Sequence, residues 1–106
     1  MKRRKVFLAP RAEVDLDSIG AWIAEQGAPL TALAFVGRIR ARITSLAEFS
    51  ERGVDHGQVR PGLRTMSMEN GVIIAYAVRE AHVEVERVFS PWQNWRAALR
   101  LDDKES

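Results

Sequence analysis

The chain has 106 residues, 46% of them hydrophobic, which suits one compact domain and excludes a disordered protein. It contains no cysteine, which excludes disulfides and thiolate chemistry, and its net charge of +2 is too small to indicate nucleic-acid binding. Residues 1–5 are basic, but the four apolar residues before Pro10 are too few for a secretory signal. No apolar run approaches the roughly 18 residues that span a membrane, so we expect a cytoplasmic protein with no membrane contact.

The N-terminal third predicts a strand followed by a helix. Residues 4–9 are predicted to form a short strand that ends at Pro10, and proline suits the first position of a helix because its missing N–H has no partner there. Four apolar side chains then recur at helical spacing and predict one buried stripe: Ala12, Leu16, Ile19 and Ile23. Gly27 and Pro29 are typical of a helix end and of a new helix start.

A second helix is predicted from Leu30 to Phe49. Its apolar seam steps by four and three residues: Ala32, Val36, Ile39, Ile43 and Leu46. The break between the two helices is very short, so they must be antiparallel neighbours. Residues 50–58 are polar and contain two glycines, which predicts a loop.

The last third predicts a β-meander and a closing helix. Two strands, Leu63–Glu69 and Val72–Arg79, flank Asn70-Gly71, a strong hairpin signal. The second strand is apolar on both faces, which is typical of a central strand. His82–Phe89 alternates apolar and acidic side chains as a strand with one wet face does. Pro91 ends it, and a short helix is expected over Trp92–Leu101.

These elements predict an α+β fold in the order β-αα-βββ-α. An antiparallel α-helical hairpin packs on a small, mainly antiparallel sheet. No repeat or linker divides the chain, so we expect a single domain over residues 1–101 and a short polar tail over residues 102–106.

Arg87 is the first candidate site residue. By alternation it shares a face with Val83 and Val85, which is the expected core side of the last strand. A buried guanidinium needs a carboxylate, a backbone carbonyl or a ligand, because an unpaired buried charge is very costly. Three interpretations stay open: an internal ion pair, a bulge that turns the side chain outward, or a partner contact.

Two tryptophans and a second arginine are further candidates. Trp92 and Trp95 lie three residues apart in the closing helix, where they either anchor an interface or cover one end of the sheet. Arg64 stands at the entrance to the meander, where it either clamps an acidic partner or caps the strand edge.

Metal and cofactor sites are not indicated. His56 falls in a loop and His82 at a strand start, neither with a helical i, i+4 partner, so each is expected to be a plain surface histidine. No nucleophile elbow and no glycine-rich phosphate loop is present.

The order of these segments resembles the RelE/ParE superfamily of toxins, and its ParE branch in particular, over about Val6 to Leu99. No single piece is specific, whereas their order and spacing together are. The matching segments are Leu8-Ala-Pro-Arg-Ala-Glu-Val-Asp-Leu16, Trp22-Ile23-Ala24, Phe35 to Phe49, Arg60-Pro-Gly-Leu-Arg64, an apolar strand ending in Tyr76, and Val83-Glu-Val-Glu-Arg-Val88.

The resemblance implies a toxin-like domain and an operon-encoded antitoxin, ParD-like or similar, that wraps the toxin across the helical hairpin and the sheet groove in a hetero-oligomer. It also implies one of two activities. ParE-type toxins poison DNA gyrase and stabilise plasmids, whereas RelE-type toxins cut messenger RNA on the ribosome.

The residues favour the first activity. Cleaving RNA needs a group that takes the 2′-hydroxyl proton, and arginine is a poor base because it stays protonated. A nuclease would therefore have to use Arg64, Tyr76 and Arg87, with the tyrosine or a glutamate as base. The ParE branch usually carries a His-Gly-x-Arg-Asp type motif after its last strand, but this chain has Ser90-Pro-Trp-Gln-Asn, which leaves the target open.

We therefore expect a topoisomerase inhibitor that acts by binding, with no catalytic residue, no metal and no cofactor. The alternatives are the ribosome-dependent nuclease and an inactive homologue that only binds its antitoxin. The candidate contacts with target or antitoxin are Arg60, Arg64, Arg87, Trp92, Trp95 and Arg96; the candidate antitoxin surface of the hairpin is Trp22, Arg38 and Arg42.

Overall fold

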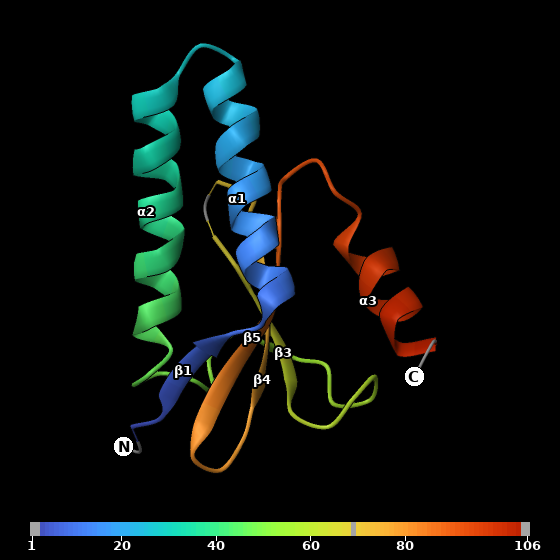
Figure 1. The fold of residues 1–106 in the computed structure, drawn as a ribbon. Helices are drawn as coiled ribbons and strands as arrows, with labels where there is room; N and C mark the ends of the chain where they lie inside the picture. The colour runs from blue at the N-terminus through green and yellow to red at the C-terminus, as the bar shows by residue number, and fades with distance from the viewer. Residues whose placement is uncertain (1–2, 69, 105–106) are drawn as a thin grey trace.

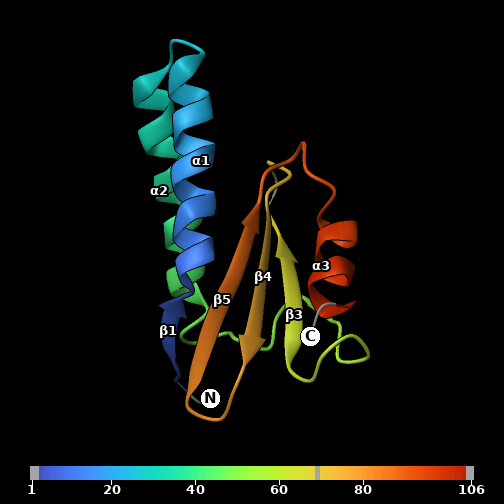
Figure 2. The ribbon, with the colours of Figure 1, turned by 45° about the vertical axis from the view of Figure 1, so that its right-hand side comes forward.

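A computed structural model describes residues 3–68 and 70–104, and side chains up to Leu99. It has a helical hairpin on one side of a five-stranded sheet and a short helix on the other (Figures 1 and 2). The predicted α+β class and the order β-αα-βββ-α are confirmed, with one added strand. The elements are β1 (Lys5–Leu8), α1 (Pro10–Glu25), α2 (Pro29–Ser45), β2 (Val54–Asp55), β3 (Leu63–Ser67), β4 (Ile73–Val78), β5 (His82–Phe89) and α3 (Trp95–Lys104).

The helical hairpin begins and ends where the sequence predicts, except at its last turn. Pro10 and Pro29 open α1 and α2, and Gly27 takes a left-handed φ of 83° between them, which glycine adopts without strain. The helix α2 ends at Ser45, four residues before the expected Phe49. After Ser45, backbone hydrogen bonds to the third residue back replace the α-helical pattern: Leu46 N donates to Ile43 O, and Ala47 N donates to Thr44 O.

The sheet has the strand order β1-β5-β4-β3-β2. Only β1 and β5 are parallel, while the other pairs are antiparallel as expected. The predicted loop over residues 50–58 is partly wrong, because Val54 and Asp55 form β2 by pairing with Thr65 and Arg64 on the edge of β3. The Asn70-Gly71 turn is confirmed, with Gly71 at a φ of 90°; Glu69 lies outside the described residues.

The two faces of the sheet bury very different amounts of apolar surface. The first face packs against α1 and α2, which together bury Leu16, Ile39 and Ile43 against strand side chains such as Ile74, Val83 and Val85. The second face carries α3, where Ala75, Phe89 and Leu99 form a small cluster with Ile73, Trp95 and Ala98 around it.

The closing helix starts later than predicted. It runs from Trp95 to Lys104, so Trp92 lies in the connector between β5 and α3, and residues 102–104 continue the helix beyond the point expected to begin a tail. Asn94 explains the start, because its side-chain Oδ1 accepts a hydrogen bond from Ala97 N at 3.2 Å, as a helix N-cap does.

A bulge in β5 corrects the expected orientation of Arg87. Ala75 pairs with Arg87, whereas the next residue, Tyr76, pairs with Val85, so Glu86 is an extra residue. The extra residue reverses the alternation: Val83 and Val85 face the hairpin, but Arg87 shares the second face with Phe89. The prediction that Arg87 lies beside Val83 and Val85 is therefore wrong.

Candidate functional site

An exposed aromatic surface joins α1 to the connector between β5 and α3. Trp22 and Trp92 stack with ring centroids 4.5 Å apart and planes tilted by 37°. Both remain accessible, with 47% of Trp22 and 55% of Trp92 exposed. A groove beside them is lined by Asp15, Ser18, Ile19, Ser90 and Gln93. We call this region, with the two indoles, the tryptophan surface.

The connector that presents Trp92 is held by its own polar groups. Ser90 is buried, and its N–H and hydroxyl both donate to Gln93 Oε1, at 2.7 and 2.9 Å. Together with the Asn94 cap, these bonds fix both ends of the segment Ser90–Asn94. The side chains that depart from the ParE-branch motif therefore have structural roles, and Trp92 projects from a braced segment.

Arg87 forms an internal ion pair, one of the alternatives that the sequence left open. Its Nε and Nη2 lie 2.8 and 3.2 Å from the carboxylate of Asp15 on α1, which also accepts a hydrogen bond from Val88 N at 2.8 Å. The two side chains are only 10% and 11% exposed. The guanidinium also lies 4.6 Å from the ring centroid of Phe89. Asp15 thus binds the unpaired edge of β5 to the hairpin.

Arg60 is also engaged within the chain. Its Nη1 and Nη2 donate to both carboxylate oxygens of Glu86, at 2.9 and 2.6 Å, and both side chains are largely buried. This two-pronged geometry is the strongest arrangement between a guanidinium and a carboxylate. Glu86 is the bulge residue, so the irregularity of β5 also positions the partner of Arg60. The sequence showed Glu86 only as one of two acidic residues on a wet strand face.

Tyr76 and Arg64 face each other in the register of β3 and β4, next to the loop before β2. Arg64 Nη1 donates to Glu51 O at 3.0 Å, and the buried Tyr76 hydroxyl donates to Arg52 O. Burial raises the pKa of Tyr76 more than the nearby cations of Arg64 and Arg52 lower it. The phenol therefore keeps its proton.

The three residues of the nuclease alternative do not converge. Tyr76 belongs to the apolar cluster under the hairpin, and its register partner Arg64 points to the same side, whereas Arg87 lies on the opposite face. A phosphate held by Arg87 would have the sheet between it and Tyr76.

Trp95 and Arg96 open α3 on the second face. The Arg96 guanidinium lies 4.5 Å from the Trp95 ring centroid, and the His56 ring meets Trp95 edge-on at 6.1 Å. His56 Nε2 lies 2.8 Å from the buried Thr65 Oγ1, so His56 links the sheet to α3 and is not the plain surface histidine we expected. His82 is half-buried and contacts Phe7 edge-on.

The hairpin offers a second surface, a shallow apolar groove between its helices. Small side chains open this groove, and Leu33, 73% exposed, stands at its rim. The Arg38 guanidinium lies 5.7 Å from the Phe35 ring centroid, and Arg42 has an interaction within the chain. The small residues along the groove are Gly20, Ala21, Ala24, Ala32 and Gly37.

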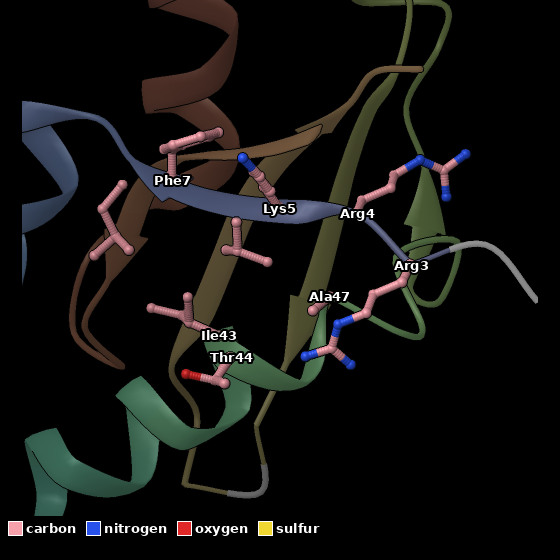
Figure 3. A pocket seen from close by; sticks show the side chains of 9 residues that line it. Arg3, Arg4, Lys5, Phe7, Ile43, Thr44 and Ala47 are labelled. Atoms are coloured by element: carbon pink, nitrogen blue, oxygen red, sulfur yellow. The ribbon is translucent and has the colours of Figure 1, made fainter. Parts of the chain in front are cut away.

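A third hollow lies between β1 and the end of α2 (Figure 3). Ile43, Thr44 and Ala47 line it from the helix side, and β1 lines it from the sheet side. We call it the edge groove. Sequence reasoning missed it, because nothing local marks a strand as the edge of a sheet.

Two features are absent from the described residues. Residues 3–68 and 70–104 contain no helix that is both long and apolar enough to cross a membrane. The same ranges hold no group of three or more His, Asp or Glu side chains placed to bind a metal ion.

Comparison with known proteins gave a family match and structural matches. Residues 6–95 match the family model described as ParE toxin of type II toxin-antitoxin system, parDE. A solved structure described as the chromosomal ParDE TA system from P. aeruginosa has a similar fold, with a TM-score of 0.71 and 22% sequence identity. The similarity covers 81% of this chain and 94% of that one. No curated protein sequence matched significantly.

Proposed function

The chain belongs to the ParE toxin family of type II toxin–antitoxin systems, and we propose from this that it inhibits DNA gyrase by binding and catalyses no reaction. A cognate, ParD-like antitoxin neutralises it in the cytoplasm by forming a hetero-oligomer. The pair would then serve plasmid stabilisation or its chromosomal equivalent.

The tryptophan surface carries this proposal. Its two indoles are half-exposed, and tryptophan is among the residue types enriched at the energetic centre of protein interfaces. Within the described residues, neither indole N–H has a hydrogen-bond partner, so each can donate to a partner protein. Trp95 and Arg96 follow in the chain and would extend this contact with the target.

Arg60, Arg64 and Arg87 receive a different assignment. Each has a partner inside the chain: Glu86, the carbonyl of Glu51, and Asp15. Releasing Arg60 or Arg87 to bind a target would leave a largely buried carboxylate without its donor, which is costly, and releasing Arg64 would break its bond to the Glu51 carbonyl. We therefore assign these arginines to holding the sheet, the loop and the hairpin together.

The antitoxin is assigned to the hairpin. Its groove of small side chains can admit a helix at close range, and Leu33 offers exposed apolar area at the rim. Trp22 and Arg38 flank α1 and α2 with exposed aromatic and cationic groups, and Arg42 lies further along α2. Because Trp22 belongs to both surfaces, a bound antitoxin would also cover part of the target contact.

A DNA supercoiling assay with purified gyrase tests the proposal. The intact chain should inhibit supercoiling, the cognate antitoxin should restore it, and Trp92→Ala should weaken inhibition at least about tenfold, as the loss of an interface anchor does. Asp17→Ala, at an exposed position on α1, serves as the matched control and should inhibit normally.

A parallel assay separates the alternatives. Cleavage of messenger RNA in a translation extract, without any effect on gyrase, would establish the nuclease and overturn the proposal. Inactivity in both assays, with tight antitoxin binding retained, would identify an inactive homologue.

A further inference from the structure

The two stacked indoles of the tryptophan surface each keep an open face. The ring centroids of Trp22 and Trp92 lie 4.5 Å apart, so each ring covers one face of the other, and about half of each side chain stays exposed. The face of an indole carries partial negative charge and attracts a cation, which in proteins is more often an arginine than a lysine. The open faces therefore suit a positively charged side chain.

The third tryptophan shows this preference satisfied within the chain. The Arg96 guanidinium lies 4.5 Å from the ring centroid of Trp95. Among the described side chains, no cation lies over the ring of Trp22 or of Trp92. These two indoles therefore lack the kind of partner that Trp95 has.

The segments that present the two indoles carry negative charge or none, although the whole chain has a net charge of +2. Residues 12–37 contain four acidic side chains and no lysine or arginine, and residues 88–95 contain no charged side chain. Two of the four acidic side chains, Glu13 and Asp15, pair with arginines of other elements. A cationic partner therefore meets no uncompensated positive charge in these segments.

Glu25 is the acidic side chain placed to act together with the indoles. It lies three residues after Trp22, so the two side chains are neighbours on one side of α1. Glu25 is exposed, and it has no ion-pair partner among the described side chains. It is also the last residue of α1, where a carboxylate opposes the helix dipole and lowers the stability of the helix. Its charge therefore does not serve the fold and is available to a partner.

We infer that the tryptophan surface receives an arginine side chain of the target, whose guanidinium stacks on an open indole face and donates hydrogen bonds to the Glu25 carboxylate. A guanidinium does both at once, because its flat face lies on the ring while its N–H groups point outward in its own plane. The inference rests on the proposed function, since the target is taken to be gyrase.

Other occupants fit this surface less well. An acidic segment would be repelled by Glu25 and by the negative faces of the indoles. A purely apolar segment would cover the Glu25 carboxylate without offering it a donor, which is costly. A second copy of this chain does carry exposed arginines, such as Arg11 and Arg38, so the oligomeric state is measured as well.

The test uses the full 106-residue chain, isotope-labelled for NMR, and the peptide acetyl-Gly-Ser-Arg-Ser-Gly-amide. The chain has three tryptophans, so three indole N–H signals report on the rings separately. At millimolar peptide the signals of Trp22 and Trp92 should move, while that of Trp95, which already has Arg96 over its ring, should not. A peptide with citrulline in place of arginine keeps the flat shape without the charge and should bind about fivefold more weakly.

Two charge reversals on α1 form a matched pair. Glu25→Lys should weaken both binding of the arginine peptide and inhibition of gyrase about fivefold or more, by turning an attraction into a repulsion. Asp17→Lys makes the same change of net charge at an exposed position that does not line the groove beside the indoles, and it should leave both unchanged. Because a lysine suits the end of a helix, Glu25→Lys should unfold at the same temperature as the parent chain or higher.

Four results would overturn the inference. They are an absence of peptide binding at millimolar concentration, equal binding by the arginine and citrulline peptides, equal losses in Glu25→Lys and Asp17→Lys, and a dimer in sedimentation that Glu25→Lys dissociates. The peptide measurements do not involve gyrase. A chain that binds the arginine peptide but spares gyrase would therefore retain the arginine site and lose the proposed target, whereas full inhibition of gyrase by Glu25→Lys would overturn the inference and leave the proposed function intact.

Discussion

The two faces of the sheet differ in how much apolar surface they bury. The first face lies under two long helices whose stripes bury Leu16, Ile39 and Ile43 against the central strands. The second face carries one short helix over a cluster built on Ala75, Phe89 and Leu99. The hairpin face therefore supplies most of the hydrophobic stabilisation. The tryptophan surface belongs to neither cluster and lies where the β5–α3 connector passes α1.

The largest expected effect contrasts one leucine from each face. Leu16→Ala should lower the free energy of unfolding by about 4 kcal/mol, because a fully packed site cannot collapse around the lost atoms. Leu99→Ala should cost about 2 kcal/mol, because α3 can shift to fill the smaller gap. Urea unfolding of both variants measures the difference. Equal losses would mean that the second face is as firmly packed as the first.

The next effect concerns the contact between the hairpin and the edge of β5. Asp15→Ala should cost about 3 kcal/mol, since it removes the carboxylate that accepts hydrogen bonds from the buried Arg87 guanidinium and from Val88 N–H. Asp17→Ala, at an exposed position on the same helix, should change stability by less than about 0.5 kcal/mol. Replacing both members, Asp15→Ala with Arg87→Met, should recover part of the loss. If the double variant loses more free energy of unfolding than the two single variants together, the ion pair does not explain the loss in Asp15→Ala.

A smaller effect concerns Tyr76, which lies in the apolar cluster of the first face and makes stability depend on pH. Tyr76→Phe should cost about 1 kcal/mol by removing the hydrogen bond to Arg52 O. Burial raises the pKa of Tyr76 above its ordinary value of 10.0, so above that pH the unfolded chain releases the proton while the folded chain retains it. Stability from this group is therefore complete below pH 10 and is lost as the pH rises. Between pH 8 and about 11.5, the free energy of unfolding should fall more steeply with pH for the parent chain than for Tyr76→Phe. An equal pH dependence in the two proteins would contradict this account.

The smallest expected change in stability belongs to the tryptophan surface. Trp92→Ala removes a half-exposed ring from a connector, so the free energy of unfolding should fall by only about 0.5 to 1 kcal/mol. Its inhibition of gyrase should nevertheless drop at least tenfold, as proposed above. Trp92→Phe should keep part of both properties by preserving an aromatic contact with Trp22. A large loss of stability in Trp92→Ala would mean that Trp92 mainly stabilises the fold and would contradict its proposed role in binding.

Local sequence patterns gave most of the fold. The spacing of Leu16, Ile19 and Ile23 predicted α1, and Asn70-Gly71 predicted the turn before β4, because each depends on neighbours in the chain. The family resemblance is confirmed over residues 6–95. The errors concern pairings between distant residues: β2 forms only because β3 offers an edge, and the bulge at Glu86 follows from pairing with β4.

The candidate site was less predictable. Trp22 and Trp92 were assigned to separate surfaces, although they stack on each other across 70 positions of the chain. Asp15 carried no signal beyond an acidic residue early in a helix, and its pairing with Arg87 requires a bulge that alternation does not reveal. Side-chain partners that are far apart in sequence depend on small shifts of register, which a single sequence does not encode locally.

Local residue patterns specify the periodicities, the turns and therefore the order of helices and strands, because these arise from steric and hydrophobic preferences within a few residues. Packing between distant segments sets which strand lies at the edge, which arginines pair with internal carboxylates and which indoles meet. One extra residue in β5 reverses the face on which Arg87 lies, and only packing between distant segments sets where such a residue is accommodated.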